Sequence, residues 1–235
     1  MKDLYLIGNA HIDPVWLWSW QEGYHEVKAT FLSALDRLDE YDGFLFTCAC
    51  AQYYAWLEQD AQPLFQRVKK EVARGRICLV GGMWIQPDLN IPSGESLVRQ
   101  LLVSQRYFLS RFGHIAITGY NVDSFGQSGM LAMLYKKAGM KNYVWMRPGD
   151  SENPDIPQGA FRLKSVDGSE VLSFRIPYDM GAYTCKENIA GKIDFLRERA
   201  KQTGAAQMVF YGVGNHGGGP TKKLLNEIES LLPKQ

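Results

Sequence analysis

The hydrophobic positions of this 235-residue chain fall into two alternating patterns. Short apolar runs indicate buried strands, and stretches in which apolar residues recur every three or four positions indicate helices. The predicted strands cover 4–9, 44–50, 77–84, 117–122, 143–146 and 208–213. The predicted helices cover 18–39, 51–74, a stretch that opens at 93, 129–138, 187–202 and 221–232. This regular alternation predicts an α/β fold with a parallel sheet.

One stretch departs from the alternation. The runs 161–166 and 170–176 flank Asp167-Gly168, which is a strong signal for a β-hairpin turn. We therefore expect six β/α units, one of them with a hairpin insertion, in an incomplete parallel β/α barrel-like domain. No repeat or long linker divides the sequence, so we expect a single domain over 1–235. An unclosed barrel has edge strands with unpaired backbone groups, which could pair with a second copy of the chain. A homo-oligomer is therefore one expected possibility.

Composition and charge exclude several classes of protein. The chain is 46% hydrophobic and 22% charged, and its net charge of +1 gives no field that favours nucleic acid or an anionic membrane. No apolar run is long enough to span a bilayer, and the N-terminus does not resemble a signal peptide. The four cysteines lack the spacing of a zinc ribbon or a disulfide framework, which favours a reducing compartment. We therefore expect a cytoplasmic protein with neither nucleic acid nor membrane as a partner.

His11 and Asp13 follow the first predicted strand. Side chains two positions apart point to the same face of a strand, so these two are expected to lie together. Imidazole nitrogen and carboxylate oxygen are good ligands for a divalent metal such as zinc. Pro14 stops the strand, and the tryptophans that begin at Trp16 add flat apolar surface, which suits a polyhydroxylated substrate. His-x-Asp also occurs at surface strand ends, so the pair needs support from the rest of the chain.

Parallel β/α folds bind ligands at the carboxyl ends of their strands. Further candidate side chains follow the other predicted strands: Trp84, Gln86, Asp88, Asn90, Asn121, Asp123, Ser124, Gln127, Trp145, Arg147, Asn215 and His216. Buried carboxylates are costly unless they are paired or metal-bound, so this clustering favours a metal site. Asp88 could instead cap its own loop, and Arg147 could be a structural ion-pair partner. The glycine-rich stretch 212–220 lacks the spacing of a phosphate loop and predicts a tight strand-to-helix loop.

Four motifs occur in an order that is typical of one enzyme family. They are HIDPVW at 11–16, GGMWIQPD at 81–88, PSGESLVRQ at 92–100 and DSFG at 123–126. Together they resemble the N-terminal catalytic domain of glycoside hydrolase family 38, the α-mannosidases, in its bacterial, cytoplasmic-type branch. The resemblance runs from residue 5 to about residue 221. It implies a zinc-dependent retaining α-mannosidase that hydrolyses the α-mannosides of oligosaccharides.

The resemblance also implies roles for single residues. His11 and Asp13 look like zinc ligands, and Asp123 looks like both a zinc ligand and the catalytic nucleophile. Trp16 looks like part of the wall of the mannose subsite, and Arg147 stands where the family places a substrate-site arginine. A retaining glycosidase also needs a second acid about 5 Å from the nucleophile. We further expect the substrate to contact Trp84, Asp88 and Asn215.

The second acid is where this chain departs from the family. Relatives carry an aspartate in the loop that Asn215 and His216 occupy here. An asparagine cannot donate a titrating proton, whereas a histidine can. His216 is therefore the candidate acid/base. The alternative is that His216 only hydrogen-bonds the substrate and that another residue supplies the proton.

The family's barrel has seven β/α units, and its fourth zinc ligand is a histidine in a later motif. That motif is expected beyond residue 235. We therefore expect 1–235 to be the N-terminal part of the catalytic domain, cut before the helical and C-terminal β domains, with little activity alone. Two alternatives stay open: another metal-dependent carbohydrate hydrolase such as a sugar deacetylase, and a non-catalytic remnant that binds sugar.

Overall fold

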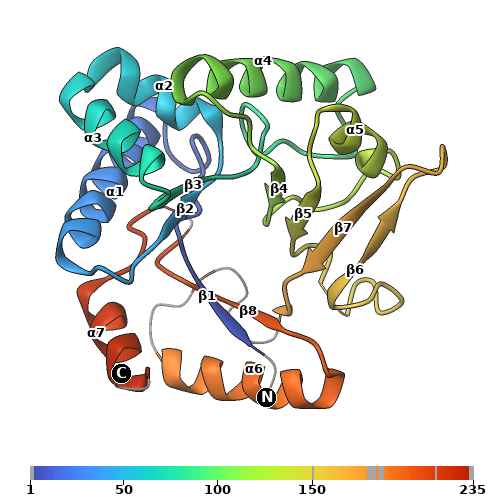
Figure 1. The fold of residues 1–235 in the computed structure, drawn as a ribbon. Helices are drawn as coiled ribbons and strands as arrows, with labels where there is room; N and C mark the ends of the chain where they lie inside the picture. Colours follow the sequence, from blue (N-terminus) through green and yellow to red (C-terminus); the bar gives the residue numbers. More distant parts are fainter. Residues whose placement is uncertain (1–2, 150, 179–183, 185–187, 215, 233–235) are drawn as a thin grey trace. The chain divides into compact units, whose positions relative to one another are not determined.

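The structure, a computed structural model, describes residues 3–149, 151–178, 184, 188–214 and 216–232. The chain splits into two compact units (Figure 1). Unit 1 is built from 1–48, 56–78 and 180–235, and unit 2 from 49–55 and 79–179. None of the helices in the described ranges combines the length and apolar character needed to cross a bilayer. Cys185 and Asn215 lie outside the described residues.

Unit 1 is organised around a four-stranded sheet with the order β3-β2-β1-β8. β1 (Leu4–Asn9) lies parallel to both β2 (Phe46–Cys48) and β8 (Gln207–Tyr211). β3 (Ile77–Leu79) follows β2 in this order. Strands from the two ends of the chain are therefore neighbours in one sheet (Figure 1).

The helices of unit 1 bury the apolar faces that the periodicity predicts. The predicted stripe of α1 (Trp20–Glu40) is buried at each of its positions: Val27, Phe31, Leu35 and Leu38. Phe31 packs edge-on against Phe46 of β2, with ring centroids 5.8 Å apart. Two later helices also belong to this unit, α6 (Ile189–Thr203) and α7 (Lys222–Leu231).

The predicted helix over 51–74 is wrong in one respect, because the chain forms two helices there. α2 (Ala51–Asp60) ends before Ala61, and α3 (Gln62–Ala73) begins after it. Pro63 lies in the first turn of α3. A proline has no backbone N–H to donate, and its ring clashes with the preceding turn, so the helix cannot run through. The apolar periodicity continues across the break and therefore does not reveal it.

Unit 2 contains a second four-stranded sheet, with the order β4-β5-β7-β6. β5 (Asn142–Trp145) lies parallel to β4 (Thr118–Asn121) on one side and to β7 (Glu170–Arg175) on the other. β6 (Gly159–Lys164) pairs antiparallel with β7, and this pair is the predicted hairpin. The hairpin thus joins the sheet through β7 (Figure 1).

Two helices of unit 2 complete its core. α4 (Gly94–Phe112) opens at Ser93, whose hydroxyl accepts a hydrogen bond from the Ser96 N–H, as a helix N-cap does. α5 (Leu131–Lys137) follows β4 along the chain. Leu97, Leu101, Tyr135 and Trp145 belong to one buried cluster. Residues from both helices and from the sheet therefore form a continuous apolar core.

The α/β class with parallel strands is confirmed, but two strands are shorter than predicted. The runs 44–50 and 77–84 contain only the three-residue strands β2 and β3. Cys50, Gly81 and Gly82 have positive φ angles of 84°, 91° and 68°. Such angles lie outside the extended region, so they end the strands before the apolar runs end.

A close contact at Gly23 generates a prediction about stability. A Cβ atom at this position of α1 would lie 2.1 Å from the carbonyl oxygen of Pro14. We expect Gly23→Ala to lower the free energy of unfolding by roughly 1–3 kcal/mol, because the loop next to Asp13 must move. Chemical denaturation measures this change. Gly94→Ala is the control, since a Cβ there has no atom within 4 Å. An equal response of the two variants would contradict the contact.

Candidate active site

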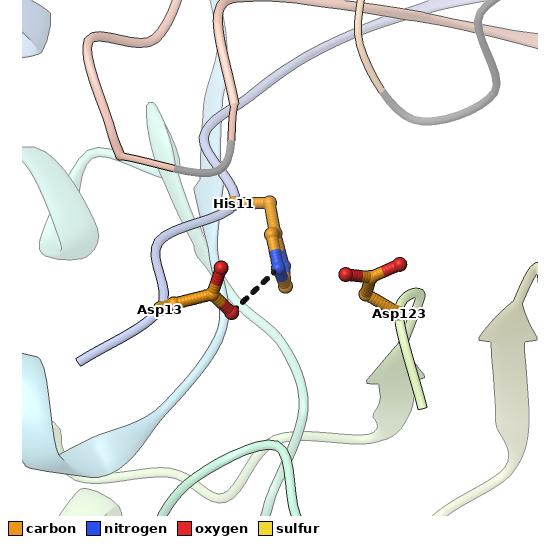
Figure 2. Close-up of side chains that lie close together, drawn as sticks. All are labelled: His11, Asp13 and Asp123. Atoms are coloured by element: carbon orange, nitrogen blue, oxygen red, sulfur yellow. Dashed lines mark ion pairs between the residues drawn. The ribbon is translucent and has the colours of Figure 1, made fainter. Parts of the chain in front are cut away.

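His11 and Asp13 lie just beyond the carboxyl end of β1, in unit 1. The His11 residue is only 3% exposed. Its Nε2 atom lies 3.2 Å from Oδ1 of Asp13, an ion pair drawn as a dashed line in Figure 2. The structure therefore brings together the two residues that the sequence pairs. A buried imidazole beside a carboxylate offers one nitrogen and one oxygen donor to a divalent cation.

The loop that carries this pair is held in place by its neighbours. The indole N–H of Trp18 donates to the carbonyl oxygen of Asp13 at 3.0 Å. Ile12 forms an antiparallel bridge with His216 in the glycine-rich segment. The side-chain amide of Asn9 donates to the carbonyl oxygen of Tyr211, at 3.2 Å. Contacts to the loop before α1, to β8 and to the segment after β8 thus fix the backbone around His11.

The glycine-rich segment after β8 is a tight strand-to-helix loop, as predicted. Gly217, Gly218 and Gly219 have φ angles of 112°, 112° and 66°, a region that side-chain-bearing residues rarely adopt. A Cβ atom at Gly212 would lie 2.0 Å from the carbonyl oxygen of Asn9. The Gly218 N–H donates to the hydroxyl of Thr30 on α1 at 2.8 Å. The glycines therefore let this loop approach the backbone of β1 and the side of α1.

His216 lies in this loop among three side chains of unit 1. Its ring stacks on the indole of Trp18, with centroids 4.0 Å apart and planes inclined by 16°. Its Nε2 atom lies 3.1 Å from Oε1 of Glu22 and 4.0 Å from Oε1 of Glu26. No motif in the sequence singles out either glutamate. The available signal is their spacing of four residues, which places both on one face of α1.

Asp123 and Arg147 lie together in unit 2. β4 and β5 run parallel with Asn121 opposite Trp145, and each charged residue follows two positions later. Arg147 Nε donates to Oδ1 of Asp123 at 2.6 Å, and the two side chains are only 23% and 22% exposed. Figure 2 labels Asp123 just past the end of its strand. Arg147 is thus the ion-pair partner of the predicted nucleophile.

Three hydrogen bonds and one ring contact stabilise the loops around this ion pair. The guanidinium of Arg147 lies 4.5 Å from the centroid of the Phe125 ring. The side-chain amide of Gln127 donates to the carbonyl oxygen of Arg147 at 2.8 Å. The hydroxyls of Tyr143 and Ser124 donate to Gln127 Oε1 and to the carbonyl oxygen of Pro87, at 2.7 Å and 3.2 Å. Burial raises the pKa of Tyr143 well above 10, so its hydroxyl stays protonated as a donor.

The remaining predicted substrate residues have diverse surroundings. Trp16 is 60% exposed and meets Trp18 edge-on, with centroids 5.5 Å apart. The Trp84 indole N–H donates to the side-chain oxygen of Gln52 at 2.7 Å. Oδ1 of Asp88 accepts from the N–H groups of Asn90 and Ile91, at 2.7 and 2.8 Å. Asp88 therefore caps its own loop, which is the alternative that the sequence leaves open.

The sequence has clear relatives among known proteins. The profile of the Glycosyl hydrolases family 38 N-terminal domain matches residues 1–234. Alpha-mannosidase G of Dictyostelium discoideum is 30% identical over 97% of this chain and 21% of its own length. An alpha-mannosidase of Saccharomyces cerevisiae is 30% identical over 98% and 21%. The chain therefore spans about a fifth of the length of these curated relatives.

Solved structures share the fold. An alpha-mannosidase from Enterococcus faecalis V583 has a TM-score of 0.77 at 17% identity, over 99% of this chain and 27% of that chain. A 4-alpha-glucanotransferase from Thermococcus litoralis has a TM-score of 0.71 at 14% identity, over 92% of this chain and 34% of that one. At these identities the likeness shows a common fold and does not distinguish between activities.

The hydrogen bond between Tyr143 and Gln127 can be tested by its removal. Tyr143→Phe removes the only proton that the hydroxyl donates and leaves Oε1 of Gln127 without this donor. We expect the free energy of unfolding to fall by about 1–3 kcal/mol, the usual effect when one partner of a buried hydrogen bond is lost. Urea denaturation measures it. Tyr5→Phe, at a residue with 53% exposure, is the control, and an equal loss there would contradict the interpretation.

Proposed function

The chain belongs to glycosyl hydrolase family 38, and we propose that it acts in the hydrolysis of the α-mannosides of oligosaccharides. The observation that carries this proposal is the position of the Asp123 carboxylate just after the end of β4. Arg147 Nε donates a hydrogen bond to its Oδ1 at 2.6 Å. Carboxylates fixed in this way serve glycosidases as nucleophiles. We also propose a cytoplasmic location, which the spacing of the four cysteines supports, because it fits neither a disulfide framework nor a zinc ribbon.

We propose that His11, Asp13 and Asp123 are ligands of one zinc ion. They offer one imidazole nitrogen and two carboxylate oxygens, a donor set that zinc accepts. The surroundings of His11 fit this role, because its buried ring turns Nε2 toward a carboxylate. When bound, zinc would act as a Lewis acid toward the hydroxyl oxygens of the sugar. The fourth ligand that the resemblance implies is not among these three residues.

We propose a retaining mechanism in which Asp123 is the nucleophile. Its carboxylate forms a bond to the anomeric carbon while the glycosidic bond breaks, and the leaving oxygen keeps the electron pair and takes a proton. Water then cleaves the resulting glycosyl ester. Arg147 orients the attacking carboxylate through its contact with Oδ1. His216 is the proposed proton donor, and it gives up a proton in the first step and takes one from water in the second.

Sugar recognition is proposed at the exposed tryptophan beside the His11 loop. The broad face of Trp16 is accessible, and flat aromatic surface suits the C–H face of a pyranose. Trp84, Asp88 and Asn215 stay predictions as substrate contacts. Of these, Trp84 already has a hydrogen-bond acceptor in Gln52, which leaves its ring for packing.

A trapping experiment tests the nucleophile. In a full-length family 38 enzyme that carries this chain as its N-terminal part, a slow fluorinated mannoside is expected to leave a mannosyl ester on Asp123, which peptide mass spectrometry locates. Asp123→Asn should carry no label, whereas Asp42→Asn, at an exposed turn residue, should be labelled like the wild type. A metal-dependent deacetylase would use a bound water and form no such ester. A label on a different carboxylate would therefore refute the assignment of Asp123.

Zinc titration tests the proposed ligands separately. Calorimetry on the metal-stripped chain should show one zinc ion bound per chain. His11→Ala, Asp13→Ala and Asp123→Ala should each weaken binding at least as much as loss of an outer partner does, roughly 10–100-fold. His114→Ala is the control, because its ring nitrogen contacts the carbonyl oxygen of Phe112 in an exposed loop. Wild-type affinity in Asp123→Ala would remove that residue from the ligand set.

A further inference from the structure

Two acidic residues of α1 face His216, and neither has an assigned role. Glu22 lies within ion-pair distance of the imidazole at 3.1 Å, and Glu26 lies at its outer limit of 4.0 Å. Among the described residues, these are the titratable side chains paired with His216. Glu22 is the stronger candidate because its oxygen lies at hydrogen-bond distance from Nε2, whereas that of Glu26 does not.

Two contacts orient the imidazole of His216: one sets its ring plane, and the other sets its rotation within that plane. The stack on Trp18 fixes the ring plane, since the two planes differ by only 16°. The Glu22 carboxylate fixes the rotation within that plane, because it lies at Nε2. Trp18 is itself tied to the carbonyl oxygen of Asp13, and the backbone of His216 is bridged to Ile12. The stack, the ion pair and the backbone bridge therefore orient the half-exposed ring relative to the His11 loop.

We propose that Glu22 is the positioning residue of His216 and selects which ring nitrogen exchanges the catalytic proton. A carboxylate at Nε2 favours the ring form that carries a proton on that atom. Nδ1 is then the nitrogen that serves the substrate. This inference rests on the proposed function, because it takes His216 as the acid/base.

With Nδ1 as the reacting nitrogen, the proton that the ring loses in the first step is regained in the second. The doubly protonated ring gives its Nδ1 proton to the glycosidic oxygen, which receives the electron pair of its broken bond to the anomeric carbon. Asp123 forms the new bond to that carbon. In the second step, Nδ1 takes a proton from the water that cleaves the ester. The Nε2 proton stays on the ring opposite Glu22 throughout. In catalytic triads a carboxylate likewise holds the imidazole through the ring nitrogen that does not react.

Nitrogen NMR of the histidine rings tests the positioning role without any need for turnover. In the 235-residue chain with ¹⁵N-labelled histidine, the neutral His216 ring should carry its proton on Nε2. Glu22→Ala should abolish this preference, Glu22→Asp should retain part of it, and Glu26→Ala should change it less. Glu229→Ala, at an exposed residue of α7, is the control and should leave the spectrum unchanged. A neutral ring with its proton on Nδ1, or identical spectra for wild type and Glu22→Ala, would overturn the proposal.

Kinetics provide a second readout that a merely structural role would not affect. Protonation matters most for poor leaving groups, so Glu22→Ala should lower kcat more for a mannobiose than for 2,4-dinitrophenyl α-mannoside. Glu22→Asp should restore part of the rate on mannobiose. An equal loss on both substrates would contradict the role of Glu22. These rates are measured on a full-length family 38 enzyme that carries this chain as its N-terminal part, because the chain alone is expected to have little activity. Absence of hydrolysis by that enzyme would instead refute the proposed function, whereas the ring spectra would still test the role of Glu22.

Discussion

The register of parallel strands decides which side chains meet at their carboxyl ends. In unit 1, Gly8 of β1 lies opposite Tyr211 of β8, so the segments after these strands run out side by side. Ile12 and His216 consequently pair across the gap between the two segments. In unit 2 the same rule acts on β4 and β5, and it places Asp123 beside Arg147. The hydrogen-bonded ladders thus bring His216 to the His11 loop and Arg147 to Asp123, although no sequence spacing links the members of either pair.

The second constraint on the site is the close approach of backbone segments. Glycine makes it possible, because at these points the backbones lie too close together for any side chain. Gly23 lies against the carbonyl group of Pro14, and Gly212 lies against that of Asn9. A helix glycine and a loop glycine therefore hold the two ends of the 9–14 segment. The site depends on these contacts as much as on its charged residues, since a shift of one of these backbones would move His11 or Asp13.

The sequence predicts local features of this fold well and its long-range features less well. The buried stripe of α1 and the hairpin at Asp167-Gly168 follow from residues near one another in the chain, and both are confirmed. The parallel pairing of β7 with β5 depends on distant partners, and a hairpin signal does not contain it. The break at Ala61 lies inside an unbroken apolar pattern, so only the proline that follows could reveal it.

The candidate site divides in the same way. His11, Asp13 and Asp123 are recognisable from motifs at strand ends, because metal and sugar chemistry restrict the residue types there. Glu22 and Glu26 resemble any charged face of a helix until the loop after β8 brings His216 against them. Two partly buried acids of the site each have a basic partner: Asp123 pairs with Arg147, and Asp13 pairs with His11. Removing one partner of such a pair leaves the other charge uncompensated, so the positioning residues constrain the site as strongly as the residues that react.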